Sequence, residues 1–366
     1  MDGYTFNAGS SSQGMDGSYA MIRELCRYNE VKEIYLEMYY GIAELEENSE
    51  RTQMTATYIL SDYMKPSFRK ISFVCRACDR DYWLYGFSPA LRERKKMFES
   101  GYIRDLTAKK KTSEYRNYIW TKTDNPEYYV DRGFVANDSD YDGSFWDTKS
   151  EGSIEKSIAL IKDNDWYKSL EQIISFCGRK GIKLVFVIAP EPERTVIGAE
   201  KYQEYHDFVG DIALQNGLEF YDFNLCKAEY FDNGDWAYFK DSDHLNTKGA
   251  EAFSDIFAKL CSDRVSKEDL FYDSLPEKER GEEPAVLGIS GPCFDKSGYG
   301  ICHVISNRDT KLEYRIEAGE DSEHMVILRD WLEEKSFILP AEGQGFLRVS
   351  WREKNGDKSG CIDTVY

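Results

Sequence analysis

The sequence predicts an α/β domain, with a parallel sheet flanked by helices, followed by a small β-sandwich. Three observations support this fold class. An unbroken apolar run at residues 184–189 is typical of a strand buried on both faces of a parallel sheet. Amphipathic helical stripes lie on either side of this run along the chain. From about residue 285, short runs of alternating apolar and polar residues follow one another closely.

The α/β pattern begins near the N-terminus. Residues 4–8 are predicted to form a short strand that ends at a Gly-Ser-Ser-Ser turn, residues 9–12. A helix is expected next, because Tyr19, Ile22 and Cys26 fall on one helical face. Residues 31–40 alternate in character and are predicted to form the next strand.

Residues 45–122 interrupt this rhythm. Their pattern is mostly helical, with breakers at Pro66 and Pro89, and predicts a helical insertion that covers the α/β core. Residues 123–150 are rich in Asp, Asn, Gly and Tyr and are predicted to be a loop.

The α/β rhythm then returns and closes a first domain at residues 1–262. Helical stripes are expected at residues 166–177, 205–213 and 250–260, with strands at 184–189 and 218–223. Residues 263–284 are charged and are predicted to be a partly helical linker. The sandwich domain, residues 285–366, is predicted to contain seven strands, at residues 286–289, 300–305, 312–316, 325–328, 337–339, 346–351 and 361–365.

Composition excludes several classes of function. The net charge is −19, so nucleic-acid binding, which needs clustered Lys and Arg, is not expected. An acidic protein also gains nothing from an anionic membrane surface. The run at residues 109–111, Lys-Lys-Lys, is interpreted as solvated surface. Cys75 and Cys78 have CxxC spacing without a second pair, so no zinc site is expected. The sequence shows neither a signal peptide nor a run of 18 apolar residues, which taken literally indicates a cytoplasmic protein.

The strongest chemical motif is the stretch from Asp241 to Ala250, Asp-Ser-Asp-His-Leu-Asn-Thr-Lys-Gly-Ala. Of the four histidines, His244 is the one expected to lie just ahead of a helix with an Asp three residues before it. An imidazole held by a carboxylate is the general base of Ser–His–Asp chemistry, in which the carboxylate fixes the tautomer. The sequence therefore predicts His244 as base and Asp241 as its partner.

This D-x-x-H-L-N-x-x-G-A stretch resembles the last conserved block of the SGNH (GDSL-like) hydrolase superfamily, and the resemblance covers residues 1–262. It is closest to the bacterial branch that serves lipoteichoic-acid D-alanylation and exopolysaccharide O-acetylation. The resemblance implies an esterase or O-acyltransferase on acylated cell-surface carbohydrate, with His244 and Asp241 catalytic and with no metal or organic cofactor. It also implies an extracytoplasmic location beside a membrane-bound acyltransferase partner.

Two alignments place the nucleophile differently. In the first, Gly9-Ser10-Ser11 corresponds to the family's Gly-Asp-Ser block and Ser11 is the nucleophile. In the second, which fits better, residues 7–13 correspond to the next block, and the Gly9 N–H serves the oxyanion hole. The nucleophile strand would then lie upstream of Met1, and the chain would be truncated or inactive. The family's Asn donor is also absent from residues 38–41, Met-Tyr-Tyr-Gly.

A second functional class therefore stays open: a non-catalytic carbohydrate-binding or partner-docking protein that uses the C-terminal sandwich. A further motif, residues 138–143 (Asp-Ser-Asp-Tyr-Asp-Gly), matches the first half of a calcium loop. Because Lys149 stands where such a loop needs Glu, we interpret the stretch as an Asp-rich turn, and no metal is expected.

Overall fold

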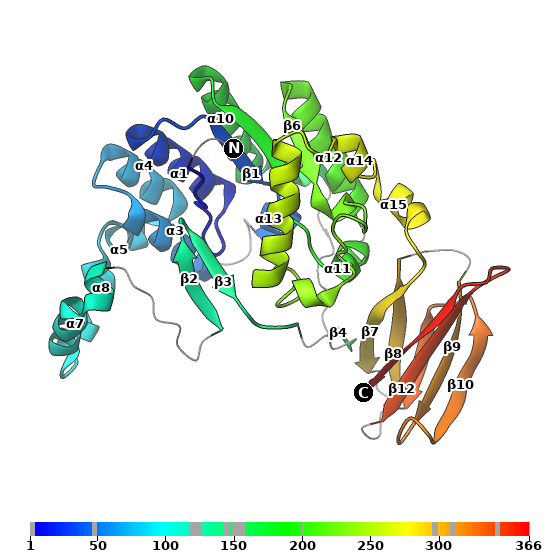
Figure 1. The fold of residues 1–366 in the computed structure, drawn as a ribbon. Helices are drawn as coiled ribbons and strands as arrows, with labels where there is room; N and C mark the ends of the chain where they lie inside the picture. The colour runs from blue at the N-terminus through cyan, green and yellow to red at the C-terminus, as the bar shows by residue number, and fades with distance from the viewer. Residues whose placement is uncertain are drawn as a thin grey trace.

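The computed structural model describes residues 4–45, 50–117, 126–141, 146–147, 158–199, 201–294, 299–307, 312–340 and 345–365. It is a mixed α/β structure with a parallel sheet between helices and a C-terminal group of antiparallel strands (Figure 1). The strands are β1 (Glu33–Glu37), β2 (Glu127–Asp131), β3 (Phe134–Asn137), β4 (Trp146–Asp147), β5 (Lys183–Ile188), β6 (Glu219–Asp222), β7 (Val286–Phe294), β8 (Tyr299–Ser306), β9 (Leu312–Gly319), β10 (Met325–Leu332), β11 (Ser336–Pro340), β12 (Phe346–Glu353) and β13 (Ser359–Val365). The α-helices are α1 (Met15–Tyr28), α2 (Tyr40–Leu45), α3 (Glu50–Tyr63), α4 (Phe68–Ala77), α5 (Trp83–Phe87), α6 (Pro89–Arg92), α7 (Tyr102–Lys111), α8 (Ser113–Asn117), α9 (Ile158–Asp163), α10 (Asp165–Lys180), α11 (Glu193–Gly198), α12 (Tyr202–Asn216), α13 (Thr247–Cys261), α14 (Lys267–Leu270) and α15 (Leu275–Gly281).

The parallel sheet has three strands in the order β1-β5-β6. The central strand β5 is the predicted apolar run, and Leu184 through Ile188 are all buried. Alternate side chains point to opposite faces. Phe186 belongs to the core formed with α1, α10 and α12, whereas Val185 and Val187 belong to the core formed with α13. Burial on both faces confirms the prediction for this strand.

The predicted helices on these faces are also confirmed. Helices α10 and α12 end where Gly181 and Gly217 adopt left-handed backbone (φ 65° and 64°), which glycine reaches without a steric penalty. Helix α13 begins at Asn246, whose side chain accepts a hydrogen bond from the Gly249 N–H.

The strand predicted at residues 4–8 is wrong. This segment joins no sheet, and Tyr4 is 93% exposed. Its backbone contact is one hydrogen bond, from the Asn7 N–H to the Arg132 carbonyl at 2.9 Å. A strand needs a neighbouring strand to satisfy its backbone groups, so a short polar-flanked run without one stays irregular. The turn at residues 9–12 therefore does not follow a sheet strand.

The loop predicted over residues 123–150 is also wrong in part, because β2 and β3 form an antiparallel hairpin. Its turn is made by Arg132 (φ 49°) and Gly133 (φ 81°). A Cβ atom on Gly133 would lie 2.0 Å from the Asn7 carbonyl oxygen. Glycine at this turn therefore lets residues 4–13 pack against the hairpin.

Residues 50–117 are helical, as the sequence predicted. Helices α3, α4 and α5 build a small apolar core against α1, from Leu60, Met64, Phe73, Val74 and Ala20. Helices α7 and α8 continue outward from this group (Figure 1).

All seven predicted C-terminal strands are present. Together with β4 they form two four-stranded sheets, in the orders β10-β9-β12-β13 and β11-β8-β7-β4. Residues from both sheets share one core, including Ile289 of β7 and Val349 of β12. The two-residue strand β4 lies outside the predicted domain boundary, since it comes from residues 146–147 and pairs in parallel with β7. The segment predicted as a linker is not a free tether either, because Leu270 of α14 and Lys278 of α15 are buried.

No helix in the described part of the chain is long and apolar enough to cross a membrane.

Gly133→Ala should destabilise the protein by more than about 1 kcal/mol, because the new Cβ meets backbone and the φ is positive. Hydrogen exchange of residues 4–13 should accelerate at the same time. The matched control is Gly178→Ala within α10, where a Cβ has open space, so that variant should be neutral or stabilised. Equal stability of both variants, measured by urea unfolding, would refute the packing described here.

Candidate functional site

The candidate site lies at the carboxyl edge of the parallel sheet. Glu37 ends β1, Asp222 ends β6, and Glu191 follows β5 by three residues. The carboxyl ends of parallel strands meet at one edge, which is where open α/β sheets bind ligands. Three acidic residues from three strands therefore gather where a site is expected.

The loop that carries Asp241 and His244 reaches the same edge. Thr195 of α11 donates a hydrogen bond from Oγ1 to the Ser242 carbonyl at 2.6 Å. Asn246, buried behind the loop, donates from Nδ2 to the Ala237 and Phe239 carbonyls at 2.9 and 3.1 Å. Thr195 lies four residues after Glu191, so its hydrogen bond ties the loop to the segment that carries the acidic edge. The negative charge of Asp243 also contributes to the raised pKa of Glu191.

Asp241 and His244 form the pair predicted from the sequence. Asp241 Oδ1 accepts hydrogen bonds from the His244 and Asp243 backbone N–H groups at 2.8 and 3.1 Å. The same oxygen lies 2.9 Å from His244 Nδ1. Asp243 Oδ1 lies 2.8 Å from the same ring nitrogen, so two carboxylates face one N–H. Nε2 is left to face a reacting group.

These contacts change the charge of the imidazole. Hydrogen bonding to Asp241, and then to Asp243, raises the pKa of His244 to about 10. Burial alone would raise the pKa of Asp241, but the hydrogen bonds from His244 and Asp243 outweigh burial and hold that pKa below its usual range. In this arrangement His244 is a cation at neutral pH, suited to donating a proton or stabilising an anion. A general base must be neutral, so base catalysis needs the contact with Asp243 to open.

Ser11 and Gly9 are placed differently. Ser11 is exposed in a turn beside Ser12, whose φ is 53°. Within the described residues, no hydrogen bond connects Ser11 to His244. The Gly9 N–H donates to Asn7 Oδ1 at 2.9 Å and so already has an acceptor. The structure thus unites Asp241 and His244 and leaves Ser11 and Gly9 outside that hydrogen-bonded group.

Residues 38–41, where the resemblance would place an Asn donor, include Tyr39 and Tyr40. The Met38 N–H continues the sheet by donating to the Val187 carbonyl at 2.8 Å. The Tyr40 hydroxyl is buried and donates to Glu191 Oε1 at 3.4 Å. A phenol directed at a carboxyl group therefore lies close to this edge in place of an amide.

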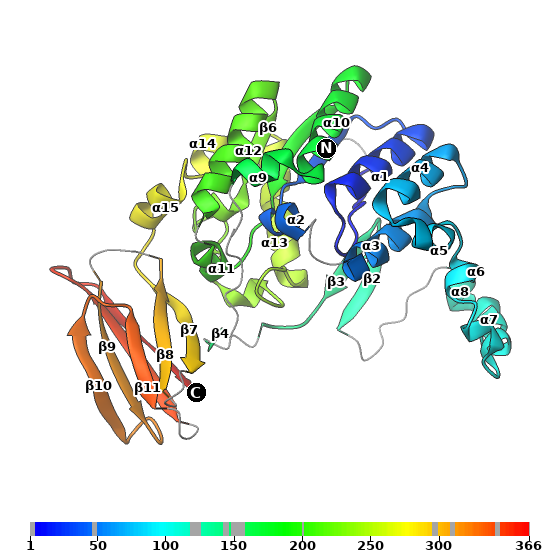
Figure 2. The same cartoon turned by 180° about the vertical axis from the view of Figure 1, so that it is seen from behind.

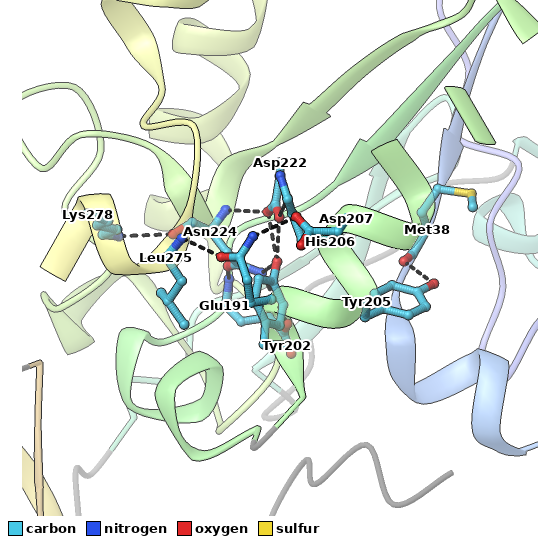
Figure 3. Close-up of polar contacts among 11 residues, drawn as sticks. Met38, Glu191, Tyr202, Tyr205, His206, Asp207, Asp222, Asn224, Leu275 and Lys278 are labelled. Carbon is cyan, nitrogen blue, oxygen red and sulfur yellow. Dashed lines mark hydrogen bonds and ion pairs between the residues drawn. The ribbon is translucent and has the colours of Figure 1, made fainter. Parts of the chain in front are cut away.

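A buried polar network beneath the edge was not predicted (Figure 3). Tyr202 of α12 lies 2.8 Å from both Asp222 carboxylate oxygens, and His206 Nδ1 lies 2.8 Å from Asp222 Oδ2. Asn224 donates from Nδ2 to Tyr202 and Glu191, at 2.9 and 3.3 Å. One signal in the sequence was available, since Glu191 lies three residues after the buried strand.

The two edge glutamates hold protons more tightly than free carboxyls. Burial raises the pKa of Glu191 well above its ordinary value, and Glu37 and Asp243 add to this effect. Solvent reaches Glu37, yet the protein packed around it raises its pKa to about 8, against the hydrogen bond from the Ala189 N–H. This edge is therefore less anionic at neutral pH than its composition indicates.

Lys278 of α15 fixes the network from behind. Its Nζ donates to the Asn224 carbonyl at 3.0 Å and to Asn233 Oδ1 at 2.6 Å. Asn233 in turn donates from Nδ2 to the Glu191 carbonyl at 3.1 Å. The segment predicted as a linker thus positions the acidic edge.

The Asp-x-x-His pairing also occurs at a second place, although only the pair at His244 stands ahead of a helix. Asp321 Oδ1 accepts from the His324 backbone N–H and lies 2.9 Å from His324 Nδ1, the same local turn. That second pair lies on the exposed connection between β9 and β10. The turn alone therefore does not define a site. What distinguishes His244 is its place beside the carboxyl edge.

The loop before α13 also carries side chains of the kinds that bind metal ions. Asp241, Asp243 and His244 offer ligand atoms within 4.8 Å of one another. His244 Nδ1 lies within hydrogen-bond distance of both carboxylates, so a metal ion at this place would have to displace the proton that they share. Asp138, the first residue of the calcium-like run, accepts hydrogen bonds from Thr247 Oγ1 at 2.9 Å and the Tyr128 hydroxyl at 3.3 Å. Asp142 and Gly143 of that run lie outside the described residues.

Two surface depressions, of about 390 and 430 Å³, lie between α1 and α10 and beside α4, away from this edge. Comparison with family models, curated proteins and solved structures finds no match.

Asp243→Asn should lower the pKa of His244 from about 10 toward 6.5, because one of its two carboxylate partners loses its charge. The raised pKa contributes stability that is complete below pH 6.5 and is lost as the pH rises through 10. Histidine ring signals followed by NMR measure the change, with His244→Gln for assignment. Asp321→Asn is the control and should leave the His244 titration unchanged.

Glu37→Gln should flatten the dependence of stability on pH between 4.5 and 8. The folded wild type holds this proton more tightly than the unfolded chain, so its stability falls as pH rises through that window. Urea unfolding at a series of pH values measures this slope. An identical slope in the variant would show that Glu37 titrates normally.

Proposed function

We propose that this chain is an SGNH-like esterase or O-acyltransferase for acylated cell-surface carbohydrate, with His244 as its acid–base residue and Asp241 as its orienting residue. One observation carries the proposal: Asp241 holds His244 Nδ1 at 2.9 Å in the loop before α13, beside the carboxyl edge of a parallel sheet. This is the arrangement in which His Nε2 exchanges a proton with a hydroxyl group.

The chemistry would proceed through both protonation states of His244. The cation donates a proton to the alkoxide that leaves when the ester bond breaks. The neutral form takes the proton from the attacking hydroxyl, which requires that Asp243 move away from Nδ1 or lose its charge. Ser11 remains the proposed nucleophile and the Gly9 N–H the proposed oxyanion donor, and both need residues 9–12 to rearrange toward His244. A membrane-bound acyltransferase outside the cytoplasm is the partner that the resemblance implies.

A second candidate function is non-catalytic carbohydrate binding or partner docking. It is favoured by the acceptor already held by the Gly9 N–H, by the tyrosines in place of the Asn donor, and by the charge of His244. Strand β10, at the edge of its sheet, also exposes Val326, Ile327 and Leu332.

Hydrolysis of an aryl acetate separates the two functions. His244→Ala should lower the rate by ~10²–10⁴-fold, the usual contribution of a positioned acid–base group. Asp241→Asn should lower it as well, and Ser11→Ala should abolish it if Ser11 is the nucleophile.

The matched control is His324→Ala. It removes a histidine that is paired with Asp321 in the same way but lies between β9 and β10, so the rate should be unchanged. Wild-type activity that survives His244→Ala would exclude the catalytic proposal. Binding of acetylated polysaccharide by that variant, measured by calorimetry, would then support the second function.

A further inference from the structure

Residues 89–117 form a helical arm. It contains α6, a 3-10 turn (Lys96–Phe98), α7 and α8. Figures 1 and 2 both place α7 and α8 at the end of the molecule opposite the C-terminal sheets. The arm is anchored at its base, where Arg92 donates to the Tyr85 carbonyl at 2.6 Å and lies over the Tyr58 ring, and where Arg94 donates to the Tyr85 hydroxyl at 2.9 Å.

The charge of the arm is opposite to that of the chain. Its residues include nine Lys and Arg against four Asp and Glu, a net charge of +5, whereas the whole chain carries −19. Lys96 and Arg104 are paired with Glu93 and Asp105. In the described structure Lys95 and the three lysines at 109–111 form no ion pair and are exposed. The helix dipole of α7 favours basic residues in its last turn, where residues 109–111 lie. Lys95 lies outside α7, so the dipole does not explain its presence.

Exposed apolar side chains lie among these charges. Phe98 is 91% exposed, and Met97, Leu91, Ile103 and Tyr115 are also exposed. Several large apolar side chains left in water within one short segment mark an interaction surface. Because basic residues surround them, the surface combines an apolar contact with attraction to negative charge.

We propose that this arm docks on an anionic lipid bilayer surface, with Phe98 and Met97 at the acyl boundary and the lysines on the lipid phosphates. Amphipathic helical segments bind membranes through this combination of apolar insertion and basic residues. Nucleic acid would attract the lysines but would leave Met97, Leu91 and Ile103 without an apolar partner. Salt screens the repulsion of the acidic body beyond about 8 Å at physiological ionic strength. Figures 1 and 2 show that α7 and α8 project from the rest of the molecule. This inference does not depend on the proposed function.

Co-sedimentation of the full chain with vesicles tests the proposal. The protein should bind vesicles of phosphatidylcholine mixed with phosphatidylglycerol, should not bind phosphatidylcholine alone, and should dissociate as salt rises. Replacing Lys109, Lys110 and Lys111 with Glu should weaken binding by more than ~10-fold, since each basic residue near an anionic surface contributes about fivefold. Phe98→Ser should also weaken binding.

Two controls are matched to these variants. The first control replaces three exposed lysines outside the arm with Glu, which gives the same change in net charge: Lys32, Lys180 and Lys267. Leu214→Ser removes an apolar side chain that is 80% exposed on α12. Both controls should bind as the wild type does. The proposal is overturned if the protein does not bind the anionic vesicles, or if it binds both vesicle types equally. It is also overturned if the control variants lose as much binding as the arm variants. Preferred binding to an oligonucleotide, together with an unchanged affinity of the Phe98→Ser variant for vesicles, would overturn it as well.

Discussion

Burial of strand β5 on both faces is the constraint on which the α/β part depends. Phe186 and Ile188 enter the core with α1, α10 and α12, while Val185 and Val187 enter the core with α13. The strand also pairs with β1 on one side and β6 on the other. A strand with four occupied sides fixes both helical layers, and it sets the level at which the neighbouring strands end. The acidic edge exists because Glu37, Glu191 and Asp222 are all placed by this one strand and its partners.

The edge brings several carboxyl groups together in a partly buried region, where burial disfavours their charged forms. Asp222 is hydrogen bonded to Tyr202, Asn224 and His206. Burial raises the pKa of Glu37 and of Glu191, which favours their neutral forms. Lys278 of α15 donates to the carbonyl of Asn224 and also forms an ion pair with Glu193, at 3.0 and 4.0 Å. The segment after residue 262 is therefore part of the site's architecture.

The paired turns at Asp241 and Asp321 show what a short motif does by itself. An Asp side chain that accepts backbone N–H groups two and three residues on will hold a His at the third position wherever it occurs. The chemical meaning comes from the surroundings. The first turn is hydrogen bonded to Thr195, four residues after Glu191, whereas the second lies exposed between β9 and β10.

The sequence by itself determined the elements whose signal is local. The apolar run of β5, the helix ends at Gly181 and Gly217, the seven C-terminal strands and the pairing of Asp241 with His244 all follow from patterns a few residues long. Only the tertiary structure decided what depends on distant partners. Residues 4–8 lack a neighbouring strand, and β4 joins a sheet across more than a hundred residues. Glu191 meets Asn224, and Asn224 meets Lys278, through folding alone. The charge of the arm was also hidden by the chain-wide total, because net charge averages over surfaces that folding separates.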